Sequence, residues 1–412
     1  MSEAAVNKMN SGPLQGVRIT EFTSAWAGPY ATCLLAFLGA EVIKVESRRR
    51  IDHSRFISFT TGKSFSTPDE SSVFNNLNLN KLSITLNLSK PKAVEIAKRL
   101  VQISDVTVEN MRPGVMPRLG LGYEVMKEVK PDIIYLSSSA CGQTGPEREY
   151  VGYAPTFAAL AGLPYITGYE DWPPSNFMGA IDLRSATTSA FAILTALLFR
   201  QRTGEGQYID LSSQESIVAL SGEVLLDYIM NNRVQKRQGN KQEFMAPHNC
   251  YRCKGDDNWI SIVAASEEEW QALVEAMGMP ELAQDERFTT AHHRWSNQDE
   301  LDRIISEWTK DQDYYEVMER LQKAGVAAAP SLSGERLFKD PHLRQRGIFM
   351  EVEHPVIGKD WVIAPPWRLS ATPARIDRSA PLLGEHNENV FKHLLGMSQE
   401  QIKELEEEQV IY

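Results

Sequence analysis

A single aspartate near the middle of the chain offers the clearest chemistry in the sequence. Asp182 lies in residues 179–184 (GAIDLR), just before an apolar segment, residues 187–199, whose pattern predicts a buried helix. Unpaired N–H groups and the dipole at the start of a helix stabilise an anion, so we expect Asp182 to be ionised. An aspartate at this position is most often a cap for the first turn. An ionised carboxylate held in one orientation and facing a cavity can also act as a nucleophile.

Three polar or basic clusters in the first half of the chain offer binding sites for anionic groups. They fall at the ends of predicted strands, where open parallel sheets bind their ligands. Arginine suits phosphate because its planar guanidinium binds two oxygens at once, although a solvated charge run is the usual explanation of any one such cluster. Together they predict a site for several phosphates, with the members Lys44, Arg48, Arg49, Arg50, His53 and Arg55 in the first cluster, Asn78 and Lys81 in the second, and Asn110, Met111, Arg112 and Arg118 in the third.

The elements that must position these residues follow the alternation of a parallel α/β sheet. Such alternation is typical of parallel strands joined by crossover helices. The first strand leads into residues 23–29 (TSAWAGP) and not into the glycine fingerprint of dinucleotide binding, so a nicotinamide or flavin cofactor is not expected. Strands are predicted at residues 17–22, 41–45, 106–109, 132–137 and 207–211, and helices at residues 31–38, 91–102 and from Ser213 to about Met230.

The character of the sequence changes after Met230. Residues 231–246 are polar and basic, as in a linker. A predicted hairpin around residues 255–258 and several amphipathic helices follow. The expected fold class is therefore α/β, with a Rossmann-like large domain that contains an open parallel sheet and a smaller α+β domain. Residues 1–230 are assigned to the N-terminal part of the large domain, and residues 231–325 to the linker and the small domain.

The composition of the chain argues against several classes of function. Its 412 residues carry 43 basic and 54 acidic side chains, whereas general nucleic-acid binding needs a basic surface. The first eight residues lack the layout of a secretory signal, and the longest apolar run, residues 190–199, is too short to cross a bilayer. Four cysteines without an export signal favour reduced thiols in the cytoplasm. Cys250 and Cys253 lack a second pair, so no metal site is expected.

Ordered motifs along nearly the whole chain resemble those of the class III (family III) CoA-transferases, which include formyl-CoA transferase and carnitine CoA-transferase. The matching stretches begin at residues 14–19 (LQGVRI) and end at residues 381–387 (PLLGEHN). Between them lie AGP at 27–29, LGAEVIKVE at 38–46, NLNK at 78–81, ENMRPG at 109–114, RLG at 118–120 and TGEGQ at 203–207.

The resemblance implies an architecture and an assembly. In this family both ends of the chain build a Rossmann-like large domain, and two protomers thread through each other like links. Residues 326–412 are accordingly expected to be a return segment that completes the large domain. The resemblance implies an obligate, interlocked dimer, formed by two copies of this chain or by this chain and a related subunit.

The resemblance also implies roles for particular residues. The family's nucleophile is the aspartate that opens the helix before the T-G-x-G turn, and Asp182 occupies that position. Asn110, Arg118 and Lys81 are implied to lie along the CoA nucleotide. The full predicted CoA site comprises Ala25, Arg48, Asn78, Lys81, Asn110, Met111, Arg112 and Arg118, and the predicted acyl and oxyanion pocket comprises Trp26, Ala27, Gly28 and Tyr153.

The implied reaction moves CoA from an acyl-CoA to a free carboxylic acid through Asp182. The carboxylate attacks the donor thioester to give a mixed anhydride, and the released thiolate then forms an aspartyl-CoA thioester. The incoming acid repeats the exchange in reverse. Residues 25–28 are the expected N–H donors to each oxyanion, because glycine lets the backbone approach a ligand closely. CoA thioesters are therefore substrates, and no permanently bound cofactor is expected.

Two departures from the family pattern bear on the substrate. Trp26 replaces a glutamine of formyl-CoA transferases, and residues 240–247 replace their glycine-rich lid, so oxalate or formate is not expected. A tryptophan beside the reacting carbonyl suits an acceptor acid with an apolar or aromatic body. Succinyl-CoA is the expected donor, as in the benzylsuccinate CoA-transferase branch. Packing of Trp26 in the core remains the alternative to this role.

Two other functions compete with CoA transfer. The α-methylacyl-CoA racemases share the fold, but they need a histidine base in the stretch that corresponds to residues 145–154, where Tyr153 stands instead. Tyrosine is a poor base near neutral pH. A CoA-binding subunit that leaves the chemistry to a partner is the second alternative, and the presence of Asp182 argues against it.

Overall fold

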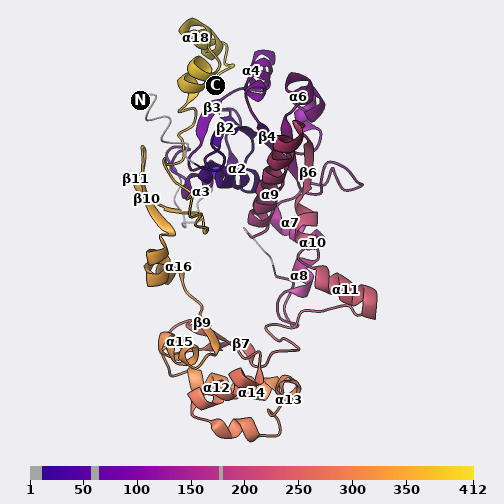
Figure 1. The fold of residues 1–412 in the computed structure, drawn as a ribbon, viewed down its shortest axis with the longest axis vertical. Coiled ribbons are helices and arrows are strands. Elements are labelled where there is room, and N and C mark those ends of the chain that lie inside the picture. Colours follow the sequence, from indigo (N-terminus) through magenta and orange to yellow (C-terminus); the bar gives the residue numbers. More distant parts are fainter. Residues whose placement is uncertain (1–11, 57–64, 176–179) are drawn as a thin grey trace. The chain divides into compact units, whose positions relative to one another are not determined.

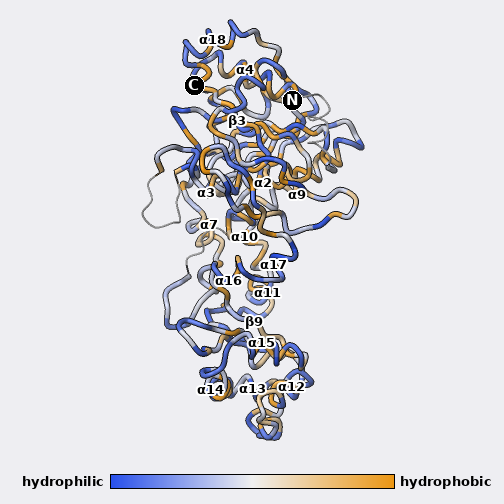
Figure 2. Tube along the Cα trace, turned by 90° about the vertical axis from the view of Figure 1, so that its left-hand side faces the viewer, coloured by the Kyte–Doolittle hydropathy of each residue, from blue (hydrophilic) through white to orange (hydrophobic). Residues whose placement is uncertain are grey.

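The chain divides into two compact units, which a computed structural model describes for residues 12–56, 65–175 and 180–412 (Figure 1). The larger unit comprises Met1–Leu163, Asn176–Arg233 and Arg344–Tyr412, and therefore draws on both ends of the chain. The smaller unit comprises Pro164–Ser175 and Val234–Leu343. Hydrophobic segments, orange in Figure 2, occur in both units, and each unit has a hydrophobic core of its own.

The unit boundaries differ from the expected ones in two places. The smaller unit extends beyond residue 325 because β9 (Ala327–Pro330) pairs with β8 (Trp259–Val263), with Ala328 opposite Ile262. It also includes Pro164–Ser175, which we had assigned to the large domain. This segment is held by a hydrogen bond from the Gly239 N–H to the Gly168 carbonyl, 2.9 Å.

A six-stranded parallel sheet forms the centre of the larger unit, and it confirms the predicted α/β, Rossmann-like fold class. The strand order is β3-β2-β1-β4-β5-β6. The order reverses between β1 and β4, which is the switch point outside which open sheets bind ligands. All five predicted strands are present within two residues of their expected ends, and β3 was not predicted; the bounds are β1 (Arg18–Phe22), β2 (Glu41–Glu46), β3 (Leu82–Thr85), β4 (Val106–Glu109), β5 (Ile134–Ser139) and β6 (Tyr208–Ser212).

Helices cover both faces of this sheet. Residues of α4 and of the C-terminal segment share one buried cluster, and residues of α2 and α9 share another. The described helices of the larger unit are α2 (Ala27–Phe37), η1 (His53–Phe56), α3 (Ser72–Leu77), α4 (Pro91–Gln102), α5 (Val115–Arg118), α6 (Tyr123–Val129), α7 (Ala154–Leu160), α9 (Ala180–Thr203), α10 (Ser213–Val218), α11 (Gly222–Asn231), η3 (Asn389–Leu394) and α18 (Gln399–Glu407). Two further helices, α8 (Leu163–Ile166) and α17 (Pro341–Arg346), contain residues of both units.

Two of these helices differ from their predicted extents. The single helix expected from Ser213 to Met230 is broken before Gly222, a residue that is unfavourable by roughly 1 kcal/mol inside a helix. Helix α9 begins at Ala180 and is long and apolar enough, by length and composition, to cross a membrane. One of its faces nevertheless packs on α2 through buried residues such as Ala190 and Ile193, as in a core helix.

The return segment covers the open edge of the sheet. At edge strand β3, the Thr85 N–H donates to Asn387 Oδ1 at 2.8 Å and the Ser83 N–H to His386 Nδ1 at 3.2 Å. Side chains that occupy edge N–H groups prevent pairing with another strand. Beyond this contact, β10 (Phe349–His354) and β11 (Gly358–Ile363) form an antiparallel ribbon.

The smaller unit packs its helices on a three-stranded antiparallel sheet of order β7-β8-β9. The predicted hairpin joins β7 (His248–Arg252) to β8, and Cys250 pairs opposite Ser261 in it. Trp270, Phe288 and Leu301 are fully buried in its core. The remaining elements are α12 (Glu267–Met277), η2 (Pro280–Gln284), α13 (Ala291–Ser296), α14 (Gln298–Thr309), α15 (Tyr314–Lys323) and α16 (Gly334–Lys339).

Candidate functional site

Helix α9 brings Asp182 to the carboxyl edge of the sheet. Arg200, near the end of this helix, pairs with Asp105 at 2.7 Å, and Asp105 directly precedes β4. The end of α9 is therefore anchored at the amino edge. Asp182 lies eighteen residues earlier, or roughly 27 Å back along the helix at the usual rise per residue. Helix α2 also starts at the carboxyl edge, because it follows the end of β1 directly.

The carboxyl group of Asp182 is partly desolvated. The side chain is partly buried in the first turn of α9, and burial raises the pKa of Asp182 to about 6. Within the described part of the chain, no hydrogen bond or ion pair stabilises its charged form. The group is thus ionised at neutral pH but poorly solvated, which favours a nucleophile over a saturated cap.

A tight loop, residues 23–28, occupies the switch point and is hereafter called the switch loop. Asn110, just after β4, binds both main-chain polar groups of Ser24: Asn110 Oδ1 accepts the Ser24 N–H and Asn110 Nδ2 donates to the Ser24 carbonyl, both at 2.8 Å. Ala25 has a φ of 69°, in the left-handed region. A Cβ added at Gly28 would lie 2.7 Å from Thr23 Cβ and 3.0 Å from Asn110 Cγ. Four predicted site residues, Ala25, Ala27, Gly28 and Asn110, thus come together here.

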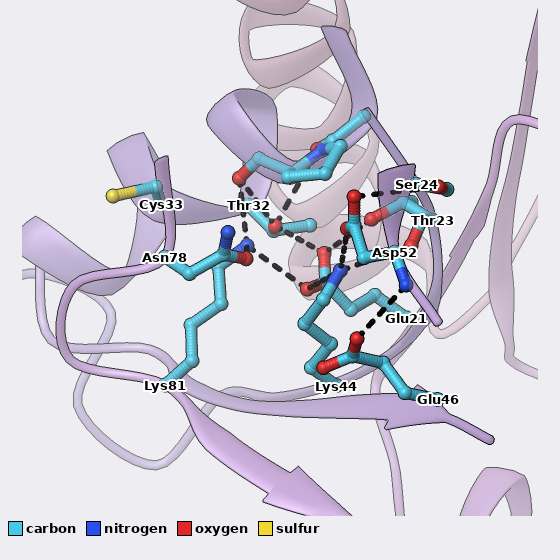
Figure 3. Close-up of polar contacts among 12 residues, drawn as sticks. Glu21, Thr23, Ser24, Thr32, Cys33, Lys44, Glu46, Asp52, Asn78 and Lys81 are labelled. Atoms are coloured by element: carbon cyan, nitrogen blue, oxygen red, sulfur yellow. Dashed lines mark hydrogen bonds and ion pairs between the residues drawn. The ribbon is translucent and has the colours of Figure 1, made fainter. Parts of the chain in front are cut away.

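Four buried charges lie beneath the switch loop (Figure 3). Lys44 Nζ lies 2.7 Å from Asp52 Oδ2 and donates to the Thr23 carbonyl at 2.9 Å. Lys81 Nζ lies 2.9 Å from Glu21 Oε1. Burial opposes the charge on Lys44, but Asp52 and Glu21 outweigh it and leave the pKa of Lys44 above its usual value. Burial likewise opposes the charge on Asp52, yet Lys44 and several hydrogen bonds hold the pKa of Asp52 below its usual value.

The position of Lys81 corrects its expected role as a phosphate contact. Its ammonium is fully buried and has three protein acceptors, Glu21 Oε1 at 2.9 Å, the Pro29 carbonyl at 2.7 Å and Asn78 Oδ1 at 2.9 Å. An ammonium has only three N–H donors, so none is left for a phosphate. Asn78 is also fully buried, and its amide donates to the Phe74 carbonyl at 3.0 Å. Lys81 thus supports the start of α2, and Asn78 holds Lys81 in place.

The arginines of the predicted CoA site, by contrast, are exposed at the carboxyl edge. Arg48 follows β2, while Arg112 and Arg118 follow β4, and all three are exposed. The guanidinium of Arg118 lies over Gly114, where an added Cβ would be 2.9 Å from Nη1. Met111 is half-buried, and its N–H donates to Glu109 Oε2 at 2.7 Å. Glu109 was not predicted as a site residue, and burial raises its pKa to about 7.

A cavity of about 280 Å³ lies beside β5 and α7. Helix α7 also packs against the start of α9, since Ile181 lies in one buried cluster with Ala154 and Ala158. Tyr153 does not line the cavity: its side chain is 75% exposed, and its backbone N–H donates to Thr156 Oγ1 at 2.9 Å. Burial, followed by the nearby Glu147, raises the pKa of the Cys141 thiol. The lining residues are Ala140, Cys141, Glu149, Tyr150, Val151, Thr156, Phe157 and Leu160.

The remaining predicted residue, Trp26, precedes α2 and is half-buried. Its carbonyl accepts the Tyr30 N–H at 3.0 Å, so it belongs to the first turn of the helix as well as to the switch loop. Among the described residues, no three His, Cys, Asp or Glu side chains gather as they would around a metal ion. The polar groups described at this edge are the Asp182 carboxylate, the backbone N–H groups of the switch loop and the exposed arginines.

Known proteins are similar to this chain in sequence and in structure over nearly its whole length. The sequence model of CoA-transferase family III matches residues 14–387. Succinyl-CoA--D-citramalate CoA-transferase of Chloroflexus aurantiacus is 35% identical over 97% of this chain and 98% of its own length. Succinyl-CoA:glutarate CoA-transferase of Homo sapiens is 34% identical over 96% of this chain and 89% of its own length. A CAIB/BAIF family protein from Brucella suis superposes with a TM-score of 0.83 at 30% identity, over 93% of this chain and all of the other. The protein is an enzyme of CoA-transferase family III.

Proposed function

We propose that this enzyme moves CoA from succinyl-CoA to an organic carboxylic acid through a thioester on Asp182. The observation that carries the proposal is the half-buried Asp182 carboxylate, which burial keeps poorly solvated at the carboxyl edge of the sheet. Both curated relatives described above are named for succinyl-CoA, which supports that donor. The acceptors in their names, D-citramalate and glutarate, are aliphatic acids. Trp26 instead favours an acceptor acid with an apolar or aromatic group, so the acceptor panel described below includes both kinds of acid.

The reaction needs no external acid or base. Asp182 attacks the thioester carbonyl, the C–S bond breaks, and the CoA thiolate leaves a mixed anhydride. The thiolate attacks the Asp182 carbonyl, succinate leaves, and an aspartyl-CoA thioester remains. The acceptor carboxylate then attacks this thioester, and the same two steps run in reverse to restore Asp182 and release the new acyl-CoA. Charge is conserved at every step, because each nucleophile and each leaving group is an anion.

The start of α2 supplies the proposed oxyanion donors. The first N–H groups of any helix have no intrahelical acceptor. Ala27 and Gly28 are the first two residues of α2, and neither N–H has a backbone partner among the described residues. Donors fixed before the reaction stabilise a developing oxyanion more than water can, and loss of one typically costs 10²–10³-fold in kcat.

Exposed groups at the same edge form the proposed CoA site. Arg48, Arg112 and Arg118 are free to meet the nucleotide phosphates, with Ala25, Asn110 and Met111 nearer the switch point. Lys81 and Asn78 support this site indirectly, from beneath the switch loop, since both are buried. We propose that Tyr153 lies at the mouth of the acyl pocket, because it directly precedes α7, which contributes residues to the cavity lining.

Exposed apolar residues support the proposed dimer. Phe191 on α9 is 70% exposed, and Met230 on α11 is 76% exposed. Neighbouring large apolar side chains on these two helices, Leu198, Leu226 and Ile229, are exposed as well. Phe191 and Leu198 lie two turns apart on α9, and exposed apolar side chains that share a helix face are typical of a protein interface. A second copy of this chain, or a related subunit, is the proposed cover.

Isotope exchange tests the function without knowledge of the acceptor. Labelled succinate should enter succinyl-CoA in the presence of the protein, and mass spectrometry should find CoA on the peptide that carries Asp182. Freshly prepared Asp182→Asn should lose at least a thousandfold in exchange yet bind CoA normally, because the nucleophilic charge goes and the shape stays. An adduct on another residue would overturn the assignment.

Three further measurements separate the alternatives. A panel of aliphatic dicarboxylates and aromatic acids, glutarate and benzylsuccinate among them, identifies the acceptor class. Solvent deuterium entering the α-position of an acyl-CoA, with no second acid present, would indicate a racemase. The third measurement repeats the exchange and adduct assays with and without a second subunit. If the protein alone binds CoA but shows neither succinate exchange nor the adduct, and both appear when a second subunit is added, the enzyme is a heteromeric transferase.

A further inference from the structure

We propose that the buried Lys44–Asp52 ion pair positions the switch loop for catalysis. In this proposal, which rests on the proposed function, the pair holds the left-handed turn at Ala25 so that the Ala27 and Gly28 N–H groups face the oxyanion formed at Asp182. Neither Lys44 nor Asp52 touches the reacting atoms. Both are positioning residues.

Asp52 binds the switch loop directly with one oxygen. Asp52 Oδ1 accepts the Ala25 N–H at 2.9 Å and the Ser24 hydroxyl at 3.3 Å. The same oxygen accepts the N–H and the hydroxyl of Ser54, at 2.9 and 2.7 Å, which fixes the carboxylate on its own turn. The other oxygen, Oδ2, faces Lys44 at 2.7 Å. The carboxylate therefore ties two loop residues to a buried cation.

Lys44, on strand β2, holds the switch loop at a third residue; Lys44 and Asp52 together are hereafter called the clamp. Its ammonium donates to the Thr23 carbonyl at 2.9 Å, and Glu21 Oε1 lies 3.7 Å away. The loop is thus held at Thr23 by Lys44, at Ser24 and Ala25 by Asp52, and from the other side at Ser24 by Asn110. Gly28, the last residue of the switch loop, packs closely against Thr23, which leaves no space for the loop to shift there.

The conformation of Ala25 explains why a clamp is needed. A residue with a Cβ rarely adopts a positive φ, and such a residue persists only where its surroundings over-determine it. Released from its contacts, Ala25 would favour an extended or right-handed conformation, and the N–H groups two and three residues later would turn with it. A displacement of about 1 Å at a catalytic donor can cost on the order of 100-fold in rate.

A neighbouring ion pair, between the buried Arg55 and the half-buried Asp69, provides the control. Asp69, like Asp52, joins a buried cation to a backbone N–H: Asp69 Oδ1 lies 2.6 Å from Arg55 Nη1 and accepts the Leu383 N–H at 2.9 Å. Its contacts are with the return segment and Arg55, not with the switch loop. Asp69→Asn therefore makes the same chemical change without releasing Ala25.

The test compares Asp52→Asn with Asp69→Asn in succinate exchange. We expect Asp52→Asn to lower kcat for exchange about 30- to 100-fold while the Kd for CoA changes less than threefold. Asp69→Asn should leave both quantities within about threefold of wild type. Hydrogen–deuterium exchange of the peptide containing Ala25 should accelerate in Asp52→Asn alone. Equal losses of kcat in both variants, or unchanged exchange at Ala25, would overturn the proposal.

A rescue variant keeps the test decisive if Asp52→Asn loses stability. Glycine adopts φ near 69° without strain, so Ala25→Gly in the Asp52→Asn background should recover at least fivefold of the lost kcat. A purely structural role of Asp52 predicts no such recovery, and its absence would count against positioning. If wild-type protein forms no Asp182–CoA adduct but the amide exchange at Ala25 still depends on Asp52, the proposed function fails while the clamp on the loop stands.

Discussion

The two edges of the central sheet use ion pairs in opposite ways. At the amino edge, Arg18 pairs with Glu41, each side chain about a quarter exposed, and Arg200 pairs with Asp105 near solvent. At the carboxyl edge, Lys44 and Asp52 are fully buried. The amino-edge pairs join the ends of strands and helices. The carboxyl-edge pair ends in hydrogen bonds to a loop, so its charges fix a backbone conformation as well as the packing.

The energetic consequence follows from burial. Exposed pairs contribute roughly 0–1 kcal/mol, because water and salt screen them. A buried pair gains little net stability, but removal of one partner leaves an unpaired charge and costs about 3–5 kcal/mol. A network that is costly to break yet of little net benefit for folding is well suited to hold a site in one geometry.

Replacement of Lys44 should have the largest effect on stability. Lys44→Met leaves Asp52 without its cation and Glu21 with Lys81 alone, so we expect a loss of about 3–5 kcal/mol in the free energy of unfolding. Urea denaturation followed by circular dichroism measures it. Arg18→Met, the matched change at the amino edge, should cost less than about 1 kcal/mol. Similar losses in the two variants would remove the energetic distinction between the edges.

Gly28→Ala should have the next largest effect. The added Cβ would lie 2.7 Å from Thr23 Cβ, a contact that cannot persist without movement of the switch loop. We expect a loss of about 100-fold in succinate exchange and of roughly 1–3 kcal/mol in stability. Gly222→Ala is the control, because open space surrounds a Cβ at that position in α11. Gly28→Ala with wild-type exchange would show that the loop tolerates displacement.

How far the site was predictable from the sequence depended on how local each signal is. The strands are short apolar runs between Gly, Pro and Asn, and a buried parallel sheet has that pattern. Asp182 is recognisable because it stands at the start of a long apolar helix. Arg112 and Arg118 follow a strand, so the topology alone brings them to the carboxyl edge.

The missed features depend on contacts between distant residues. Lys81 lies in a polar run that is typical of a surface, and its burial depends on acceptors distant in the sequence, Glu21 and Pro29. A usable signal was present in Glu21 and Lys44, which interrupt strands that are otherwise apolar, and charges inside buried strands require partners. The place of Pro164–Ser175 in the smaller unit likewise depends on hydrogen bonds to residues about seventy positions later.

The pH dependence of the first half-reaction distinguishes Asp182 from the buried pair. Because burial raises the pKa of Asp182 to about 6, the carboxylate is lost as the pH falls through that value. Formation of the CoA adduct should therefore be constant above pH 7 and fall about tenfold per pH unit well below pH 6. The pKa of Asp52 is lowered, so its charge persists throughout this range.

Glu109 is the control for that profile, since its pKa is raised to about 7. Glu109→Gln should leave the midpoint near pH 6, because only the protonation of Asp182 removes the nucleophile. Pre-steady-state adduct formation, with the Kd for CoA followed over the same pH range, measures the midpoint. If the midpoint moved in Glu109→Gln, the titrating group would be Glu109 and the assignment of the profile to Asp182 would be wrong.

Asp105→Asn should have the smallest effect, and it completes the comparison of the edges. Asp105 resembles Asp52 in its contacts: one oxygen accepts the Arg18 N–H at 2.7 Å and the other pairs with Arg200 at 2.7 Å. Asparagine keeps an acceptor for the N–H and loses only a partly hydrated charge, so we expect a loss of about 1 kcal/mol or less in unfolding free energy. Succinate exchange should stay at the wild-type rate, because the anchored end of α9 lies a helix length from Asp182. If Asp105→Asn slowed exchange as much as Asp52→Asn, the effect of a lost carboxylate would not depend on the edge at which it lies, and loop positioning would no longer explain the buried pair.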